Sequence, residues 1–254
     1  MRVASKDGTP IEYTREGSGP AVILVGGALD DGAENAALVP ALATDFTVVN
    51  YARRGRGGSG DTPPYAVERE IEDLAALIAE AAEPAHLYGV SSGGMFALEA
   101  AAAGLPVARL ALYEVPYDPS PGAAPRYDEY RERLAEALGA GRRDEALALF
   151  MRLAGSSDDD IEGARTSPYW SALEALAPTL AYDAVLYGPP PAERLATVTQ
   201  PTLVATGGAN EFFGYAADAV AALLPSAVRE TFGGQGHVAD PKVVAQALRR
   251  FYLC

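Results

Sequence analysis

A serine set between two closely spaced glycines is the pattern in this chain that points most directly to catalysis. The segment HLYGVSSGGMFALEA places Ser91 between Gly89 and Gly93, as G-x-S-x-G. A short apolar run precedes the pattern and an alanine-rich run follows it, which predicts a strand, a sharp turn and a helix. The turn needs small residues two positions before and after the serine, so that strand and helix can approach. Ser92 lacks a glycine two positions before it, so Ser91 is the candidate nucleophile.

A serine hydroxyl is a weak nucleophile unless a base removes its proton, and the chain has two histidines that could do so. His237, in GQGHV, follows the last predicted strand and precedes the last predicted helix. His86 begins the strand that ends beside Ser91, ~16 Å away along an extended chain. We therefore predict that His237 is the general base and that His86 is structural.

The elements that must position these residues alternate along the chain. Short β-branched runs alternate with longer segments rich in alanine, leucine and glutamate, which predicts an α/β chain with a mostly parallel sheet. Strands are expected at residues 11–14, 21–25, 46–50, 85–90, 109–114, 201–205 and 227–231. Helices are expected at residues 35–42, 66–82, 92–103, 215–224 and 242–251, the last one after an N-cap aspartate and a proline.

The alternation stops between residues 117 and 196, where helical stretches at 127–138 and 144–153 are punctuated by glycine and proline. We predict a helical cap over 117–196, inserted into a core domain formed by 1–116 and 197–254. The cap has aromatic and apolar side chains of its own, among them Met151, Tyr169 and Trp170. As a group they could wall a substrate pocket; singly, each could equally seal the cap onto the core.

In its serine turn, strand order, late histidine and insertion, the chain resembles the α/β-hydrolase superfamily over nearly its whole length. The resemblance implies an α/β-hydrolase fold: a mostly parallel sheet flanked by helices, with the cap inserted after the sixth strand. It also implies an oxyanion hole formed by two backbone N–H groups, those of Ser92 and Ala28. The loop that carries Ala28 reads Val-Gly-Gly-Ala, so Gly26 stands where the superfamily usually has histidine, and Gly27 is a candidate for the pocket floor.

The segment RRGRGGS at residues 53–59 matches the Arg-Gly-x-Gly-x-Ser loop of many superfamily members. A run rich in arginine and glycine could also indicate RNA binding. Its position after a predicted strand of a strongly acidic chain favours a structural role.

The third member of a catalytic triad is the open question. The superfamily pattern Gly-x-x-Asp appears here as Gly207-Gly208-Ala209-Asn210, so an amide replaces the expected carboxylate. Exchanging the carboxylate for an amide can cost about 10⁴ in rate, because an amide does not balance the charge of the imidazolium. Three alternatives remain: Glu114 on the neighbouring strand, Glu211 in a shifted loop, or a Ser–His dyad oriented by Asn210.

We favour Glu114, which ends the strand RLALYE. A glutamate at the mouth of a buried strand is costly to bury without a partner. Some superfamily members, haloalkane dehalogenases among them, carry their acid on this strand. Dehalogenation is not implied, because the nucleophile here is a serine. The competing interpretation of Glu114 is an ion pair with an arginine of the cap or of the 53–56 loop.

Composition and charge reduce the range of possible functions and partners. The chain has 254 residues and a net charge of -14, which disfavours nucleic acid and anionic membranes as partners. It has one cysteine, Cys254, and two histidines, which excludes an internal disulfide and a histidine-rich metal site. The N-terminus lacks the apolar segment of a secretory signal and no run approaches the ~20 apolar residues of a membrane span, so we predict a cytoplasmic protein.

The predicted function is that of a cofactor-free, carboxylesterase-like serine hydrolase, which cleaves an ester or related acyl bond of a small molecule through an acyl-enzyme on Ser91. Two alternatives stay open. One is a lyase, cyclase or acyltransferase that uses the same fold and base, and the other is a ligand-binding protein with a degenerate triad. Neither the natural substrate nor the oligomeric state follows from the sequence.

Overall fold

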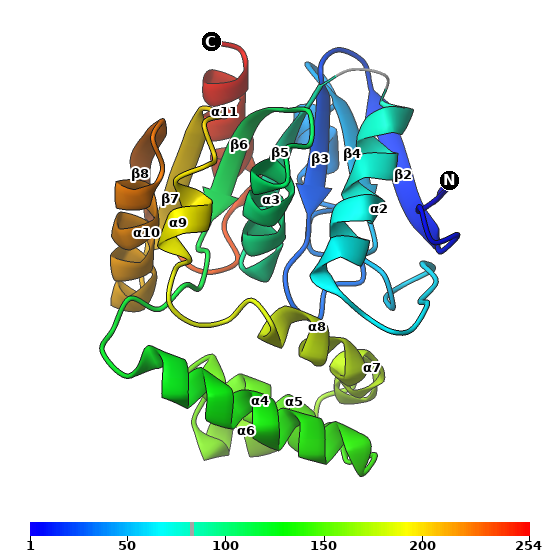
Figure 1. Ribbon diagram of the computed structural model, residues 1–254, viewed down its shortest axis with the longest axis vertical. Helices are drawn as coiled ribbons and strands as arrows, with labels where there is room; N and C mark the ends of the chain where they lie inside the picture. Colours follow the sequence, from blue (N-terminus) through cyan, green and yellow to red (C-terminus); the bar gives the residue numbers. More distant parts are fainter. Residues whose placement is uncertain (82–83) are drawn as a thin grey trace.

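A mixed sheet forms the centre of the molecule (Figure 1). The computed structural model describes residues 1–81 and 84–254, and within these residues eight strands form one sheet in the order β1-β2-β4-β3-β5-β6-β7-β8. The first two pairings, β1 with β2 and β2 with β4, are antiparallel, and all others are parallel. The prediction of a mostly parallel sheet is confirmed. The strands are β1 (Arg2–Ala4), β2 (Pro10–Gly17), β3 (Ala21–Val25), β4 (Thr47–Tyr51), β5 (Ala85–Val90), β6 (Val107–Tyr113), β7 (Thr202–Gly208) and β8 (Ala227–Gln235).

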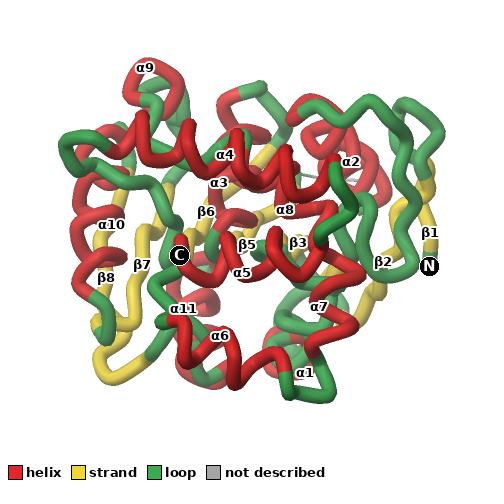
Figure 2. The backbone as a smooth tube through the Cα atoms, turned by 90° about the horizontal axis from the view of Figure 1, so that it is seen from below, coloured by secondary structure: helices red, strands yellow, loops and turns green. Residues whose placement is uncertain are grey.

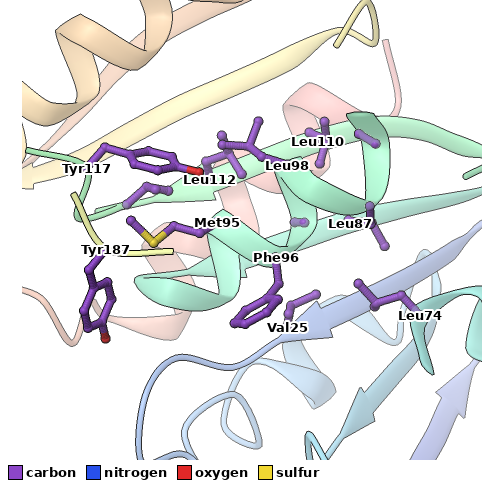
Figure 3. Close-up of a cluster of buried hydrophobic side chains, with 14 of the residues drawn as sticks. Val25, Leu74, Leu87, Met95, Phe96, Leu98, Leu110, Leu112, Tyr117 and Tyr187 are labelled. Atoms are coloured by element: carbon purple, nitrogen blue, oxygen red, sulfur yellow. The ribbon is translucent and has the colours of Figure 1, made fainter. Parts of the chain in front are cut away.

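Helices cover both faces of the sheet, because successive side chains of a strand point to opposite faces. In β3, Ile23 and Val25 face the layer of α2, α3 and α10, whereas Val22 and Leu24 face the layer of α1 and α11. Figure 3 shows part of the first layer, where Met95 and other side chains of α3 pack on the sheet. These helices are α1 (Val39–Leu42), α2 (Val67–Glu80), α3 (Ser92–Ala102), α10 (Glu211–Leu223) and α11 (Pro241–Tyr252).

Further helices are inserted between β6 and β7, as predicted. Figures 1 and 2 show α4 to α8 lying across the carboxyl ends of the parallel strands, whereas α9 packs beside α3 and α10. The division into core and cap domains at residues 117 and 196 stays a prediction. The inserted helices are α4 (Ala123–Gly139), α5 (Arg143–Leu153), α6 (Asp158–Arg165), α7 (Trp170–Leu176), the 3-10 turn η1 (Ala177–Thr179), α8 (Leu180–Ala184) and α9 (Ala192–Leu195). None of the helices that the structure describes is both long and apolar enough to cross a membrane.

Some elements of the structure differ from the local predictions. The edge strand β1 was not predicted, since three residues are too few to show a period. Of the helix predicted over 35–42, only the second half, Val39–Leu42, is helical, as α1. Upstream of it, the Asp30 carboxylate accepts hydrogen bonds from the N–H groups of Gly32 and Glu34, both at 2.9 Å. Such local bonds compete with helix formation. The helix predicted over 66–82 ends at Glu80, and its last predicted residue lies outside the described ones.

Candidate active site

Ser91 occupies the sharp turn between β5 and α3. Its backbone has φ 54° and ψ -130°, a region that residues other than glycine rarely adopt. A Cβ on Gly89 would lie 2.5 Å from the Cα of Gly94, and one on Gly93 would lie 2.2 Å from the Val25 carbonyl oxygen. Both glycines are therefore required for the close approach of strand and helix.

Two strand ends meet at this turn. The Ser91 N–H donates to the Tyr113 carbonyl at 2.9 Å, and the Glu114 N–H donates to the Ala205 carbonyl at 3.0 Å. These bonds hold the ends of β5, β6 and β7 side by side. The serine and the glutamate thus lie on neighbouring segments of the same edge of the sheet.

The loop after β3 lies against the serine. A Cβ on Gly27 would stand 3.1 Å from the Ser91 Cβ, so the loop backbone passes directly beside the nucleophile candidate. The Gly27 N–H points to Glu34 Oε2 at 3.4 Å, whereas the Ala28 N–H donates to no acceptor among the described residues. The Ser92 N–H is in the first turn of α3, where the helix itself offers no acceptor. Two backbone donors are therefore available near Ser91.

Gly26 stands where the superfamily usually has histidine, and the space around it explains why the residue is small. A Cβ on Gly26 would fall 1.8 Å from Asp30 Oδ2, so no larger side chain fits there without displacing Asp30. Asp30 is itself buried, and this burial raises the pKa of its carboxyl. The aspartate that caps the downstream turn thus fills the space that a histidine side chain would need.

Glu114 lies directly behind the imidazole of His237. It follows β6 with φ 49° and is 1% exposed. Its Oε2 lies 2.7 Å from His237 Nδ1, and its Oε1 accepts the Gly207 N–H at 3.0 Å. Among the described residues no arginine pairs with it, so the competing ion-pair interpretation is not what the structure shows. Next to it, the Tyr113 hydroxyl donates to the Gly236 carbonyl at 2.6 Å and holds the histidine loop.

The residues that follow β7 take other positions. Asn210 is the N-cap of α10, where its Oδ1 accepts the Phe212 N–H at 2.9 Å. Glu211 is the exposed first residue of that helix. Neither side chain bonds to His237 within the described part of the chain. The loop contributes a backbone N–H instead, since its Gly207 donates to Glu114.

An aromatic ring also fixes the imidazole. Phe213 stacks on His237 with ring centroids 4.8 Å apart and an interplanar angle of 12°. No sequence pattern singles out Phe213, because only the return of α10 toward the histidine loop brings the rings together. The other histidine, His86, lies at the opposite end of β5 and stacks on Tyr252 at 4.4 Å.

The four predicted pocket residues fall into different surroundings. Gly27 adjoins Ser91, as described above. Trp170 and Met151 pack in a small cluster of the inserted helices, which Leu29 of the loop after β3 joins. Tyr169 is 73% exposed, because it precedes Trp170 at the start of α7 and neighbouring helical residues point about 100° apart. Its side chain faces solvent.

Three buried arginines follow β4, in the segment expected to be structural. Arg53, Arg54 and Arg56 are each at most 1% exposed. Arg53 pairs with Glu70 of α2 and with Asp183 of α8, both at 2.7 Å, and Arg56 pairs with the other oxygen of Asp183 at 2.5 Å.

Burial alone would raise the pKa of the Asp183 carboxyl, but the charges of Arg53 and Arg56 outweigh it and hold this pKa below its ordinary value. The sequence contains no motif that marks Asp183 or Glu70 as partners of the arginines. Within the described residues, no group of three or more histidine, cysteine, aspartate or glutamate side chains could hold a metal ion.

Comparison with known proteins agrees with this architecture. The profile of the alpha/beta hydrolase family matches residues 22–247. The crystal structure of an alpha/beta hydrolase from Sphaerobacter thermophilus DSM 20745 is 44% identical, covers 99% of this chain and all of its own, and superimposes with a TM-score of 0.89. A thermophilic esterase from Thermogutta terrifontis is 23% identical, with a TM-score of 0.74 over all of this chain and 97% of its own, a likeness in fold alone.

The mostly parallel sheet, the strained serine turn at its edge and the helices inserted above it are together the architecture that these comparisons match. The chain belongs to the alpha/beta hydrolase family. A more local match is the pyrrolizixenacetamide deacetylase of Xenorhabdus hominickii, 36% identical over 98 residues, which are 36% of each chain. The chain thus matches about a third of the length of its curated relatives.

Proposed function

We propose that this protein is a cofactor-free serine hydrolase that cleaves an ester or related acyl bond of a small molecule, with Ser91, His237 and Glu114 as its catalytic triad. The observation that carries the proposal is the pair formed by Glu114 Oε2 and His237 Nδ1 at 2.7 Å, beside a serine in a strained turn. A carboxylate at Nδ1 fixes the tautomer in which Nε2 can accept the serine proton.

The reaction then has two halves. Ser91 Oγ attacks the acyl carbon while His237 takes its proton, and the N–H groups of Ala28 and Ser92 hold the oxyanion. His237 returns the proton to the leaving alcohol or amine, which departs and leaves an acyl-enzyme. Water, deprotonated by the same histidine, attacks the acyl-enzyme and releases the acid. No redox step or external cofactor enters this scheme.

The named relatives support acyl-bond hydrolysis. The Thermogutta structure is called an esterase and the partial Xenorhabdus relative a deacetylase, and both names describe the cleavage of an acyl bond. The inserted helices, with Trp170 and Met151 next to the oxyanion loop, would select the acyl group or the leaving group. The substrate is thus of the acylated small-molecule class.

A fluorophosphonate probe tests the nucleophile. The purified protein should be labelled at Ser91, as mapped by peptide mass spectrometry, and should hydrolyse p-nitrophenyl acetate. The Ser91→Ala variant should lose both properties while its circular dichroism spectrum stays that of the folded protein.

The same experiment separates the rival functions. A folded protein without label at Ser91 contradicts the proposal and leaves the ligand-binding alternative. Labelling without release of acid from any ester tested, but with transfer to an added alcohol, points to an acyltransferase. These outcomes differ in the product, so liquid chromatography of the reaction mixture distinguishes them.

A further inference from the structure

A buried polar network connects the inserted helices with both predicted oxyanion donors. Its centre is Asp183 of α8, which is fully buried. Asp183 contacts Ser92, although the two residues lie 91 positions apart in the sequence. Asp183 Oδ1 accepts from the Ser92 hydroxyl and from Arg53, both at 2.7 Å, and Oδ2 accepts from Arg56 at 2.5 Å. Each oxygen of the carboxylate thus accepts a hydrogen bond from at least one residue that borders the candidate active site.

The second connection runs through Arg56. Its Nη1 donates to the Gly27 carbonyl oxygen at 2.6 Å, and its Nη2 donates to Asp183. The Gly27 carbonyl belongs to the same peptide group as the Ala28 N–H. In a trans peptide the two bonds point in opposite directions within one plane. A guanidinium that holds the carbonyl therefore also sets the direction in which the Ala28 N–H points.

The same contact affects the strength of the donor. A hydrogen bond from a charged group is shorter and stronger than one between neutral groups. Hydrogen bonds in a chain polarise one another, so a cation at the Gly27 oxygen increases the positive charge on the Ala28 N–H hydrogen. Arg56 is 1% exposed, hence water screens this effect little.

The other donor is fixed from the same centre. Ser92 follows the nucleophile directly, and its own N–H is the second predicted donor. Its hydroxyl, fully buried, is anchored on Asp183. Arg53 completes the arrangement, since it lies between Glu70 and Asp183 and over the Phe96 ring at 4.0 Å.

We propose that Arg56 and Asp183 are positioning residues of the oxyanion hole, which orient the Ala28 and Ser92 N–H groups and polarise the former. Because Asp183 lies in the inserted helices, their docking assembles the hole. This inference rests on the proposed hydrolase function and extends it. Arg56 acts through the Gly27–Ala28 peptide group, whose carbonyl it holds, and Asp183 acts through Arg56 and the Ser92 hydroxyl.

A matched pair of arginine variants tests the proposal. Arg54 is as buried as Arg56 and lies two residues away, but it pairs with Asp73 and Asp7 and with no residue of the oxyanion loop. We expect Arg56→Met to lower kcat for p-nitrophenyl acetate about 10- to 100-fold with little change in KM, as when an oxyanion donor is lost or displaced. Arg54→Met should lower Tm but leave kcat of the folded protein within about twofold.

The affinity for a transition-state mimic distinguishes a positioning role from a purely structural one, because loss of stability alone would not change this affinity in the folded protein. Phenylboronic acid forms a tetrahedral adduct on an active serine, with an oxygen in the oxyanion hole. Its inhibition constant should rise for Arg56→Met by about the same factor as kcat falls, and should not change for Arg54→Met. If both variants lose kcat equally, or if Arg56→Met keeps the wild-type kcat and boronate affinity, the proposal is wrong.

If Arg56→Met does not fold, the Ser92→Ala variant tests the proposal instead. It removes one hydroxyl but retains the backbone N–H, and we expect a fall in kcat of about fivefold, again at constant KM. An unchanged kcat in this variant overturns the role of Asp183. Failure of the proposed function looks different, because the wild-type protein would then neither bind the fluorophosphonate probe at Ser91 nor hydrolyse the ester.

Discussion

At the residue scale, Glu114 is the proposed acid of the triad, and its own backbone conformation places it there. Its backbone is in the left-handed region, with φ 49°, which turns the carboxylate from the end of β6 toward the histidine loop. One oxygen faces His237 and the other accepts the Gly207 N–H. The loop that ends in Asn210 carries an amide in place of a carboxylate, and the Gly207 N–H at the start of that loop holds the Glu114 carboxylate on the neighbouring strand.

Glu114→Gln should therefore lower kcat by about 10³ to 10⁴, because the amide does not balance the imidazolium charge and can bind the wrong tautomer. Steady-state hydrolysis of p-nitrophenyl acetate measures the effect, with circular dichroism to verify folding.

The control for this substitution is Asn210→Ala. Loss of the N-cap of α10 should lower the free energy of unfolding by about 1 kcal/mol and leave kcat within about twofold. If instead Asn210→Ala reduces kcat strongly and Glu114→Gln does not, the acid has been assigned to the wrong residue.

At the scale of elements, the ends of β6, β7 and β8 form one closely packed unit behind the histidine. A Cβ on Gly207 would lie 2.1 Å from the Gln235 carbonyl oxygen and 2.6 Å from the Tyr113 hydroxyl oxygen. The same hydroxyl holds the Gly236 carbonyl next to His237. Only a residue without a side chain lets β7 and β8 approach this closely while leaving the Tyr113 hydroxyl in place.

We expect Gly207→Ala to lower the free energy of unfolding by about 2 kcal/mol, because it must force the strand ends apart. We also expect a fall in kcat of at least about tenfold, since the N–H that orients Glu114 moves with the strand.

Gly233→Ala is the matched control for Gly207→Ala, because a Cβ at Gly233 of β8 meets no atom within 4 Å. It should stay within about 0.5 kcal/mol of the wild type in urea unfolding and keep its kcat. A Gly207→Ala variant with unchanged kcat would show that the spacing of the strand ends does not matter for the site.

At the scale of the whole molecule, His86 and the proposed nucleophile Ser91 lie at opposite ends of the sheet. His86 pairs with Val22 near the start of its strand, while Ser91 follows the same strand's end. Burial, and after it the charge of Arg109, lowers the pKa of His86 to about 4 from its ordinary value of 6.5. The ring is therefore neutral in the folded protein at neutral pH, and it packs against Tyr252 and Phe46.

This burial makes folding stability depend on pH. Because the pKa of His86 is lower in the folded than in the unfolded chain, the unfolded state binds more protons between pH 6.5 and about 4. The free energy of unfolding should therefore fall as pH decreases through this window, by about 2 kcal/mol once partial solvent screening is allowed for.

Urea denaturation of wild type and His86→Phe at several pH values measures this contribution. The phenylalanine ring keeps the packing without the titration, so protonation of His86 should contribute nothing to the difference between the two proteins above pH 6.5. As pH falls from 6.5 toward 4, the wild type should lose stability relative to His86→Phe, by about 2 kcal/mol near pH 4. Parallel pH profiles for the two proteins would contradict the assignment.

Local chemistry made much of this molecule predictable. The glycines that the Ser91 turn requires lie within five consecutive residues, and the short apolar runs that become β3, β5 and β7 are buried on both faces. Both features can be read in short windows. The loop after β3 was harder, because the backbone N–H groups of Gly32 and Glu34, just before the helix-like pattern over 35–42, donate to the Asp30 carboxylate.

The sequence by itself determined most of the strand segments, the serine turn, the position of His237 in the chain and the short set of carboxylate candidates, because each depends on residues close together in the chain. Only the tertiary structure decided which carboxylate lies behind the histidine and that Asp183 and Arg56, 127 positions apart, meet beside the loop after β3. The physical reason is that strand order and helix docking set these neighbours. A buried charge can find its partner on any element that packs against it, and no spacing in the sequence records which one does.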